Sequence, residues 1–322
     1  MTVLISGGTG FVGLNLAAAL LARGDRVVLY ALDTPPESTL RALPGTPALE
    51  QGDVRDAPAF AACLRRHAVD RLFPFAAITS GADREGEAPE RVFEVNLLGF
   101  VSQLRAARDA GVRRVIAPSS SAVYGESVYG EGSMREDATP PVPVSLYGVS
   151  KYAVERTALR LGALWGLDVV AARIGAVFGP WERDTGLRDS LSPFWQIEQA
   201  ARARQEAVLP AEIPAYSWIY SRDAAGALLH LLDLPEPPHR VFNVCSGQSW
   251  AGRLLEWCRL LEGAYPGFGW RQSADPAEVT IRLAETRPRA ATSIERLSAT
   301  GWSPRFPPDA ALPDYLAWSR AS

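Results

Sequence analysis

The chain opens on the stretch that decides its fold class, Thr2-Val3-Leu4-Ile5-Ser6-Gly7-Gly8-Thr9-Gly10-Phe11-Val12-Gly13. A short apolar strand runs directly into a glycine-rich turn, and the helical pattern of residues 14–23 follows it. In this order of strand, turn and helix, a Gly-x-x-Gly-x-x-Gly motif is typical of dinucleotide binding. We therefore expect an α/β protein whose first unit binds a dinucleotide.

Each glycine of this motif has a physical role. Gly7 permits the tight turn, Gly10 lets the backbone approach a pyrophosphate, and Gly13 permits close packing of the helix. The phosphates would lie at the helix N-terminus, beside the backbone of Phe11 and Val12, where free N–H groups and the helix dipole favour anions. A glycine turn with a purely structural role is the alternative.

The next two strands supply candidates for the adenosine half of the cofactor. Residues 26–33 form an apolar strand that ends at Asp33, whose carboxylate would accept hydrogen bonds from the adenine ribose hydroxyls. No arginine follows until Arg41, so a 2'-phosphate has no evident cation partner, and NAD is favoured over NADP. A third strand ends at Asp53 and Val54, which we expect near the adenine. Asp53 could also cap the helix that follows.

Strands and helices keep alternating through the first half of the chain. A strand over residues 71–77 ends in Ala76 and Ala77, which are small enough for backbone to pass close to a cofactor. A helix over residues 96–109 and a strand over residues 112–118 follow. This alternation predicts a doubly wound parallel sheet, a Rossmann fold, with helices on both faces.

The second half predicts a smaller, mixed domain. We expect a dinucleotide-binding domain over residues 1–172 and a mainly substrate-binding domain over residues 173–322, with residues 215–245 returning to the first domain. The pocket should lie between the two domains, the usual place for small-molecule sites.

A Tyr-x-x-x-Lys pair marks the predicted helix of residues 147–163. Residues four apart share one helix face, so the phenol of Tyr147 and the ammonium of Lys151 point into the same space. A neighbouring cation favours the phenolate and brings the tyrosine toward proton exchange with a substrate hydroxyl near neutral pH. Lys151 is the only lysine of the chain, which indicates a need for a compact ammonium here. A solvated helix face is the alternative.

The composition excludes several classes of protein. A chain of 322 residues with 47% hydrophobic residues can bury a substantial core. A net charge of -3 and a pI of about 5.8 give no basic footprint for nucleic acid. The three cysteines and three histidines fit neither a metal site nor a disulfide frame, and we expect His67 and His239 at the surface. No secretory signal or membrane span is apparent, so we expect a cytoplasmic protein without membrane partners.

Further motifs extend the pattern over almost the whole chain. They are Gly52-Asp53, Ala76-Ala77, Asn96-x-x-Gly99, Ser120-Ser121-Ala122-Val123-Tyr124-Gly125, residues 173–180, Phe242-Asn243-Val244-Cys245-Ser246-Gly247 and Gly301-Trp302-Ser303-Pro304. Together with the glycine-rich turn and the Tyr/Lys pair, they resemble the extended short-chain dehydrogenase/reductase family, in its NAD-dependent epimerase/dehydratase group.

The resemblance implies a role for each matching residue. Tyr147 is the acid/base, Lys151 holds the nicotinamide ribose and lowers the pKa of the tyrosine, and Ser120 hydrogen-bonds the reacting oxygen. Asn96 joins the expected cofactor-binding residues. The resemblance also implies a homodimer, in which the helices of residues 96–109 and 147–163 pair, although their apolar positions also suit packing on the sheet.

Two departures from the family narrow the expected activity. Dehydratases carry Asp-Glu after the hydroxyl residue, where this chain has Ser121 and Ala122, so we expect no elimination of water. Enzymes of nucleotide-diphosphate sugars usually carry an asparagine where this chain has Ala176. That difference favours a smaller carbohydrate-like or carbonyl substrate.

The expected substrate-binding residues are Ser80, Ser121, Arg183, Arg188 and Arg222. In the family the segment after Pro180 folds over the substrate, and its arginines could clamp a carboxylate or phosphate. A solvated loop with internal Arg-Asp pairs is the alternative for this segment, and a scaffold role is the alternative for Arg222.

These residues predict an NAD-dependent oxidoreductase that moves a hydride at a secondary alcohol or ketone of a small carbohydrate-like substrate. The same groups would serve an epimerase, which holds NAD tightly and returns the hydride to the other face of a keto intermediate. The rival from another class is a non-catalytic protein that senses the dinucleotide. Such relatives usually lose the Tyr/Lys pair, which this chain keeps.

Overall fold

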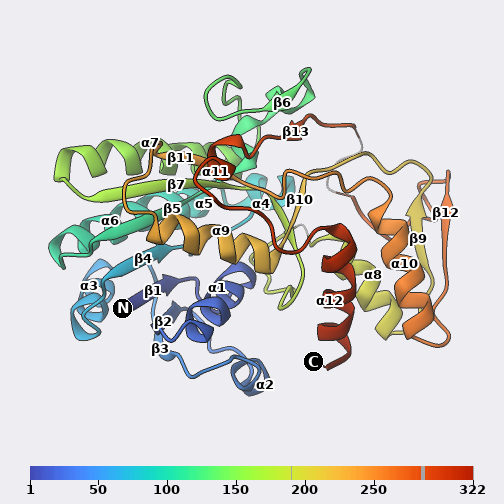
Figure 1. Cartoon of the computed structure of the whole chain (residues 1–322), viewed down its shortest axis with the longest axis horizontal. Helices are drawn as coiled ribbons and strands as arrows, with labels where there is room; N and C mark the ends of the chain where they lie inside the picture. Colours follow the sequence, from blue (N-terminus) through green and yellow to red (C-terminus); the bar gives the residue numbers. More distant parts are fainter. Residues whose placement is uncertain (190, 284–286, 322) are drawn as a thin grey trace.

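One seven-stranded parallel sheet forms the centre of the protein (Figure 1). The structure, a computed structural model, describes residues 1–189, 191–283 and 287–321. The strands of the sheet are β1 (Thr2–Ser6), β2 (Arg26–Ala31), β3 (Ala48–Gln51), β4 (Arg71–Pro74), β5 (Arg114–Ser120), β7 (Asp168–Ile174) and β11 (Val241–Val244). Their order is β11-β7-β5-β4-β1-β2-β3, and every neighbouring pair is parallel. This is the doubly wound arrangement that the alternation of strands and helices predicts.

Helices cover both faces of the sheet. The long helices of this domain are α1 (Phe11–Ala22), α3 (Ala57–Arg66), α6 (Phe100–Asp109), α7 (Leu146–Trp165) and α9 (Ser221–Asp233). Shorter helices are α2 (Glu37–Arg41), α4 (Ala82–Glu87), α5 (Pro89–Phe93) and the π-helical turn η1 (Glu94–Gly99), which joins α5 to α6. In Figure 1, α1 and α9 lie side by side on one face of the sheet.

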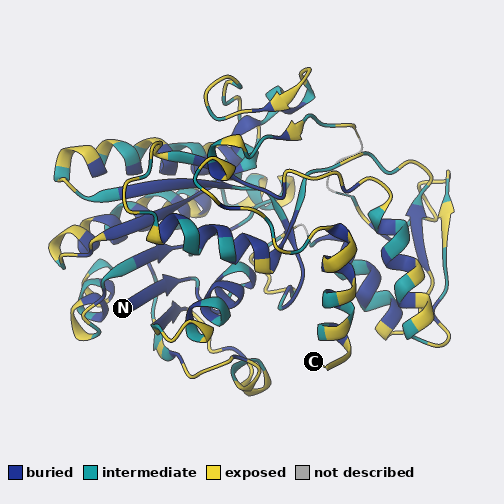
Figure 2. Ribbon diagram, in the orientation of Figure 1, coloured by how far each residue is buried: buried dark blue, intermediate teal, exposed yellow. Residues whose placement is uncertain are grey.

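The sheet has a separate hydrophobic core on each face, because side chains alternate along its strands. Val3 and Ile5 pack with residues of α1 and α9, whereas Leu4 packs with residues of α3, α6 and α7. Since successive side chains point to opposite faces, a strand covered on both sides must be apolar throughout. Figure 2 shows the result, buried strands beneath helices whose outer faces are exposed.

A second, smaller domain gathers around Phe178. Its elements are β8 (Ala176–Phe178), α8 (Pro193–Arg202), β9 (Ala207–Pro210), β10 (Trp218–Tyr220), α10 (Arg253–Ala264), β12 (Trp270–Ser273) and α12 (Pro308–Ala321). β8 pairs with β10 and β9 pairs with β12, both in parallel. The aromatic rings of Phe178 and Phe194 stack with centroids 4.0 Å apart in the core of this domain.

The border between the domains differs from the expected one. β7 continues to Ile174, where it pairs with Ser120 of β5 and Val244 of β11. A boundary after residue 172 would therefore cut a central strand of the sheet. Within residues 215–245, α9 and β11 belong to the first domain, while β10 stays with the second.

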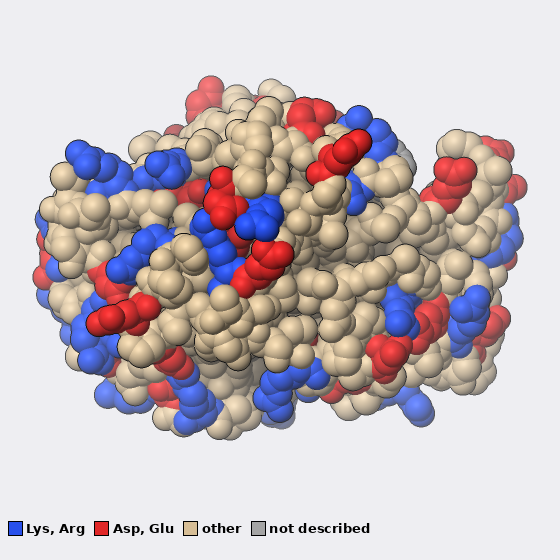
Figure 3. Space-filling model, turned by 45° about the horizontal axis from the view of Figure 1, so that its top comes forward, with Lys and Arg blue, Asp and Glu red and all other residues tan. Residues whose placement is uncertain are grey.

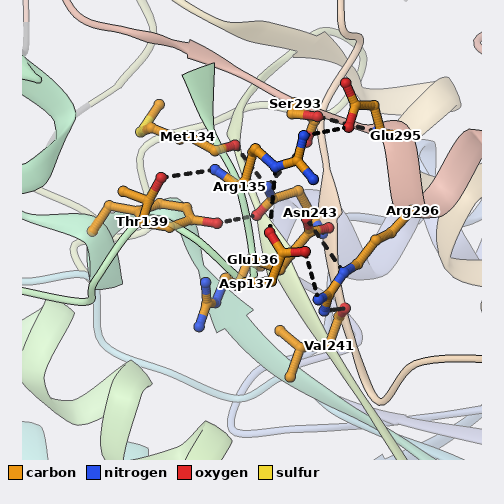
Figure 4. A network of polar contacts seen from close by, with 12 residues as sticks. Met134, Arg135, Glu136, Asp137, Thr139, Val241, Asn243, Ser293, Glu295 and Arg296 are labelled. Atoms are coloured by element: carbon orange, nitrogen blue, oxygen red, sulfur yellow. Dashed lines mark hydrogen bonds and ion pairs between the residues drawn. The ribbon is translucent and has the colours of Figure 1, made fainter. Parts of the chain in front are cut away.

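A flap above the sheet joins two distant parts of the sequence. It contains the 3-10 turns η2 (Ser121–Tyr124) and η3 (Glu126–Tyr129), the strand pair β6 (Ser133–Met134) with β13 (Ala291–Thr292), and α11 (Glu295–Ser298). Figure 4 shows how polar contacts fasten it: Glu136 accepts a 2.7 Å hydrogen bond from the backbone N–H of Asn243, and Arg135 pairs with Glu295 at 2.8 Å.

Acidic and basic side chains are interspersed on the face drawn in Figure 3, which carries no extended basic area. Among the described residues, no helix is both long enough and apolar enough to cross a membrane.

Candidate active site

The glycine-rich turn after β1 forms a cradle at the carboxyl end of the sheet. Gly7 has φ +65°, and a Cβ atom there would lie 2.8 Å from the backbone of Ala76. A Cβ at Gly13 would lie 2.6 Å from the carbonyl oxygen of Gly7. Larger residues at either position would therefore push the turn away from α1 and β4. The N-terminus of α1 has no side-chain cap, so its first N–H groups, at Phe11 and Val12, can bind an anion.

Asp33 lies beside this turn, as expected for the ribose-binding carboxylate. It accepts a 2.7 Å hydrogen bond from the Thr9 hydroxyl and contacts Arg183 at 3.3 Å. Arg183, which the sequence suggested as a substrate clamp, lies beside Asp33 and the glycine-rich turn. Its neighbours explain the position, because the Thr9 carbonyl also accepts from it at 3.2 Å.

The carboxylate of Asp53 forms an ion pair with a neighbouring arginine. Its carboxylate contacts Arg55 at 2.7 Å, and the Arg55 hydrogen bonds hold the pKa of Asp53 below its usual value. The cap of α3 is Asp56, which accepts from the Ala59 N–H at 3.0 Å. The suggestion that Asp53 caps this helix is therefore wrong, and Val54 beside it is buried in the core under α3 and α6.

Ser120, Tyr147 and Lys151 converge where β5 ends and α7 begins. Ser145 caps α7 by accepting from the Gly148 N–H at 3.0 Å, which fixes the first turn that carries Tyr147. The side chains of Ser120 and Thr79 lie close enough to the Tyr147 phenol to lower its pKa as hydrogen-bonding groups. One turn further, the Lys151 ammonium lies 5.6 Å from the centroid of the Tyr147 ring.

The electrostatics of this pair differ from the expectation that Lys151 lowers the pKa of the tyrosine. Burial raises the pKa of Tyr147, and hydrogen bonds from Ser120 and Thr79 together with the charge of Arg188 oppose that rise. Burial also lowers the pKa of Lys151, to about 8. The Lys151 ammonium lies over the Tyr147 ring, and the charge of Arg188 is one of the causes that favour the phenolate.

Asn96 holds two elements of the site together. Its side-chain oxygen accepts from the Ile78 N–H at 2.8 Å, and its amide nitrogen donates to the Ile78 carbonyl and to the Ser150 hydroxyl at 2.9 and 3.0 Å. Both amide hydrogens are thus used within the protein. Asn96 thus joins the loop after β4, where Ala76 and Ala77 approach the cradle, to helix α7, which carries Tyr147 and Lys151.

Arg188 and Ser80 form the first group of expected substrate-binding residues. Arg188 lies in the site, with its guanidinium 5.5 Å from the Phe11 ring centroid and 3.3 Å from the carboxylate of Glu182. Ser80 donates to Glu85 at 3.0 Å, and the same Glu85 oxygen accepts from the Tyr147 N–H at 3.1 Å.

Ser121 and Arg222 form the second group of expected substrate-binding residues. Ser121 begins η2 directly after Ser120. Arg222 pairs with Asp314 of α12, in the second domain, at 3.2 Å, a contact that fits the scaffold alternative.

Two further residues of the site were not anticipated. Thr79 contacts Tyr147, and it could have been found as a hydroxyl just beyond the small residues that end β4. Glu155 is fully buried one turn after Lys151 on α7 and accepts from Arg173 at 2.8 Å on each oxygen and from Ser119 at 2.7 Å. Glu155 could have been found in the sequence as a carboxylate on the apolar face of the predicted helix.

Glu50, Cys63 and His67 form a separate cluster of side chains with metal-ligand chemistry, within 4.8 Å of one another. Hydrogen bonds from His67 and Arg66 already engage Glu50, and burial raises the pKa of Cys63 to about 12. His67 is partly buried by this contact rather than exposed.

The cradle, the uncapped helix and the Tyr/Lys pair define an oxidoreductase that binds a nicotinamide dinucleotide, and comparison with known proteins identifies the family. The family model described as NAD dependent epimerase/dehydratase family matches residues 3–245. The chain belongs to this family and is an NAD-dependent enzyme of the extended short-chain dehydrogenase/reductase type.

Similar proteins come from several bacteria. Sterol demethylase protein B of Methylococcus capsulatus is 33% identical over 82% of this chain and 75% of its own length. UDP-glucose 4-epimerase of Streptomyces lividans is 29% identical over 98% of this chain and 95% of its own length. The crystal structure of Thermus thermophilus UDP-glucose 4-epimerase in complex with NAD superimposes with a TM-score of 0.78 at 26% identity and covers both chains completely.

Proposed function

We propose that this enzyme transfers a hydride at a secondary alcohol or ketone of a small carbohydrate-like substrate, with Tyr147 as the acid/base. The convergence of Ser120 and Tyr147 above a buried Lys151 carries this proposal. The glycine cradle and the free N–H groups at the start of α1 fit the pyrophosphate of NAD, and Asp33 fits its adenosine ribose.

Each polar group has a separate task in the oxidation of an alcohol. Ser120 fixes the substrate oxygen by a hydrogen bond, and the Tyr147 phenolate accepts the hydroxyl proton. Lys151 keeps a positive charge beside the tyrosine ring and can bind the nicotinamide ribose. When NAD is bound, its nicotinamide ring accepts the hydride, or returns it in the opposite direction.

The residues beside Ser120 argue against elimination of water. Ser121 and Ala122 offer neither an acid nor a base to remove a hydroxyl group. Ala176, which pairs with Trp218 between β8 and β10, offers no donor for a diphosphate. Ser121, Ala122 and Ala176 therefore support simple hydride transfer on a substrate without a nucleotide.

Epimerisation is the second candidate, and the UDP-glucose 4-epimerases among the similar proteins favour it. An epimerase would keep NAD bound and return the hydride to the other face of a keto intermediate. The sterol in the name of the Methylococcus relative is the reason to include a hydroxysterol among the substrates tested.

The deciding experiment is to denature the purified protein, quantify released nicotinamide, and assay fresh enzyme for NADH formation. The substrates are sugars, sugar acids, nucleotide sugars and a hydroxysterol. NADH formation on one class supports net oxidation, whereas stoichiometric bound NAD without net NADH supports an epimerase. In either case Tyr147→Phe should lower turnover by roughly 10²–10⁴-fold, and turnover that survives this change would overturn the mechanism.

The assembly and location of the enzyme belong to the same proposal. We infer a homodimer that pairs α6 and α7 of two subunits, supported by the exposed Leu164 on α7. A cytoplasmic location agrees with the sequence, and its test is fractionation of the cells that express the protein.

A further inference from the structure

The chain between β8 and α8 forms a strap across the carboxyl edge of the sheet. We define the strap as residues 180–189. At its start, the Pro180 carbonyl accepts a 2.8 Å hydrogen bond from the buried Asn15 of α1. At its end, the Thr79 N–H donates to the Leu187 carbonyl at 2.9 Å, and the Asp189 N–H donates to the Thr79 carbonyl at 3.1 Å. The strap is therefore held on both sides of the glycine-rich turn.

Charged groups of the strap add two further attachments. Arg183 reaches the Thr9 carbonyl and Asp33, at the end of β2, at 3.2 and 3.3 Å. Asp189 accepts from the Gly81 N–H at 2.7 Å and from Arg84 through both carboxylate oxygens. One attachment lies at the adenosine end of the cradle, and the other lies beyond the end of β4.

This path coincides with the path that an extended dinucleotide takes on such a sheet. Asp33 marks the adenine ribose, the start of α1 marks the pyrophosphate, and the loop after β4 leads toward Tyr147. Between the two attachments, the Arg188 guanidinium stands 5.5 Å from the centroid of the Phe11 ring, at the first residue of α1. A bound cofactor would thus lie beneath the strap along its length.

The surroundings of Arg183 leave part of its guanidinium open to a ligand. Its side chain is 28% exposed, its ion pair with Asp33 is 3.3 Å long, and the Asp33 side chain is more than half exposed. A guanidinium that is partly open beside the glycine-rich turn can donate hydrogen bonds to a phosphate or ribose oxygen.

We propose that Arg183 is a cofactor-binding residue that contacts the adenosine diphosphate half of NAD, and that the strap which carries it slows the release of the cofactor. Arg183 binds the cofactor directly, while the pair of Arg84 with Asp189 pins the other end of the strap. This inference rests on the proposed NAD-dependent function and narrows it, because a slowly released cofactor favours the epimerase.

Release of NADH from the loaded protein tests the strap. The purified protein is loaded with NADH and chased with excess NAD, and nicotinamide fluorescence gives the release rate. We expect Arg183→Gln to release NADH at least tenfold faster than wild type, and Arg84→Gln several-fold faster. The matched control is Arg253→Gln, whose side chain is 26% exposed, close to the 28% of Arg183, and which pairs with Asp309 on the second domain. It should release NADH at the wild-type rate.

Equilibrium binding of ADP-ribose distinguishes a residue that contacts the cofactor from one that only holds the strap in place. Calorimetry should show at least fivefold weaker binding for Arg183→Gln and less than a twofold change for Arg84→Gln, with partial recovery in Arg183→Lys. Thermal melting of each free variant controls for folding. Equal release rates for Arg183→Gln and wild type, or equal losses of ADP-ribose affinity for Arg183→Gln and Arg84→Gln, would overturn the inference alone. Failure of wild type to bind NADH would instead overturn the NAD-dependent function.

Discussion

The positive charge that acts on the Tyr147 hydroxyl comes from Arg188, and this assignment changes how the site is expected to respond to pH. Burial raises the pKa of Tyr147, whereas the Arg188 charge and two hydrogen bonds lower it. Oxidation needs the phenolate as a base, so activity in this direction should rise with pH through the pKa of the tyrosine. If Tyr147 is the acid/base, as proposed, a residue of the strap tunes its pKa.

We predict that Arg188→Gln moves the ascending limb of the pH–rate profile for oxidation to higher pH, because the lost cation no longer favours the phenolate. The measurement is kcat between pH 6 and 10 on the substrate that the panel identifies. Arg188→Lys keeps the charge and should retain most of the wild-type profile. An unshifted limb in Arg188→Gln would assign Arg188 to binding alone.

The buried charge of Lys151 lowers the folding stability of the NAD-free protein. Its side chain is 3% exposed, and burial lowers its pKa from 10.5 to about 8. Below pH 8 the folded protein holds a buried ammonium, which costs about 3 kcal/mol by this shift. Between pH 8 and 10.5 the unfolded chain binds the proton more tightly than the folded one, so the cost fades as pH rises.

Lys151→Met should therefore raise the melting temperature of the NAD-free protein at pH 7 by several degrees while abolishing turnover. The gain should shrink as pH approaches 10.5, because wild type then loses the buried charge. Differential scanning calorimetry at pH 7 and at pH 10 measures both effects. A melting temperature that falls at pH 7 would show that the ammonium has stabilising partners in the free protein.

At the scale of elements, the catalytic helix α7 is fastened to the sheet by a buried ion pair. Glu155 on α7 accepts from Arg173 on β7 through both oxygens and from Ser119 on β5. Arg173 also lies over the Tyr124 ring at 4.9 Å, and Tyr124 donates to Asn243 at 2.8 Å. The helix that carries Tyr147 is thereby joined to two strands and to the flap.

Breaking this pair should destabilise the protein strongly, since removal of one partner leaves the other charge buried and uncompensated. We predict that Glu155→Gln lowers the free energy of unfolding by ~3–5 kcal/mol, measured by urea denaturation at pH 7. Asp109→Asn, which breaks the exposed pair with Arg108 on α6, should change it by less than about 1 kcal/mol. Similar losses for both variants would contradict the role given to the buried pair.

For the whole molecule, the proposed dimer would cover exposed leucines along the layer formed by α6 and α7. Leu98 of η1 and Leu164 of α7 are 59% and 57% exposed. Leu98 lies beside the start of α7, where Asn96 binds Ser150, and Leu164 lies near the other end of that helix. Exposed apolar residues of this kind often mark an interface. The helices α6 and α7 lie next to each other (Figure 1), as pairing across a two-fold axis requires.

Light scattering at micromolar concentration should therefore give twice the subunit mass of 34.8 kDa. Leu164→Glu should shift the species toward the monomer, because burial of a carboxylate in an apolar interface is unfavourable. Leu49→Glu is the control, since Leu49 is 43% exposed on the edge strand β3. A monomeric wild type would refute the dimer.

Local patterns in the sequence determined the Rossmann sheet, the glycine cradle and the pairing of Tyr147 with Lys151. Each depends on residues close together in the chain, where the strand and helix periods or a required positive φ decide the structure. Strand pairing with β5 and β11, which local composition does not reveal, extends β7 to Ile174, two residues past the expected domain boundary.

Only the tertiary structure decided which charges meet. Arg183 and Asp33 are 150 residues apart in sequence, and the charge of Arg188 acts on Tyr147 although no local period relates the two. Such contacts depend on where a connecting segment crosses the sheet, which is set by packing of the whole chain. Local sequence therefore determines which residues the site contains, and the fold decides that Arg183 meets Asp33 and that the charge of Arg188 acts on Tyr147.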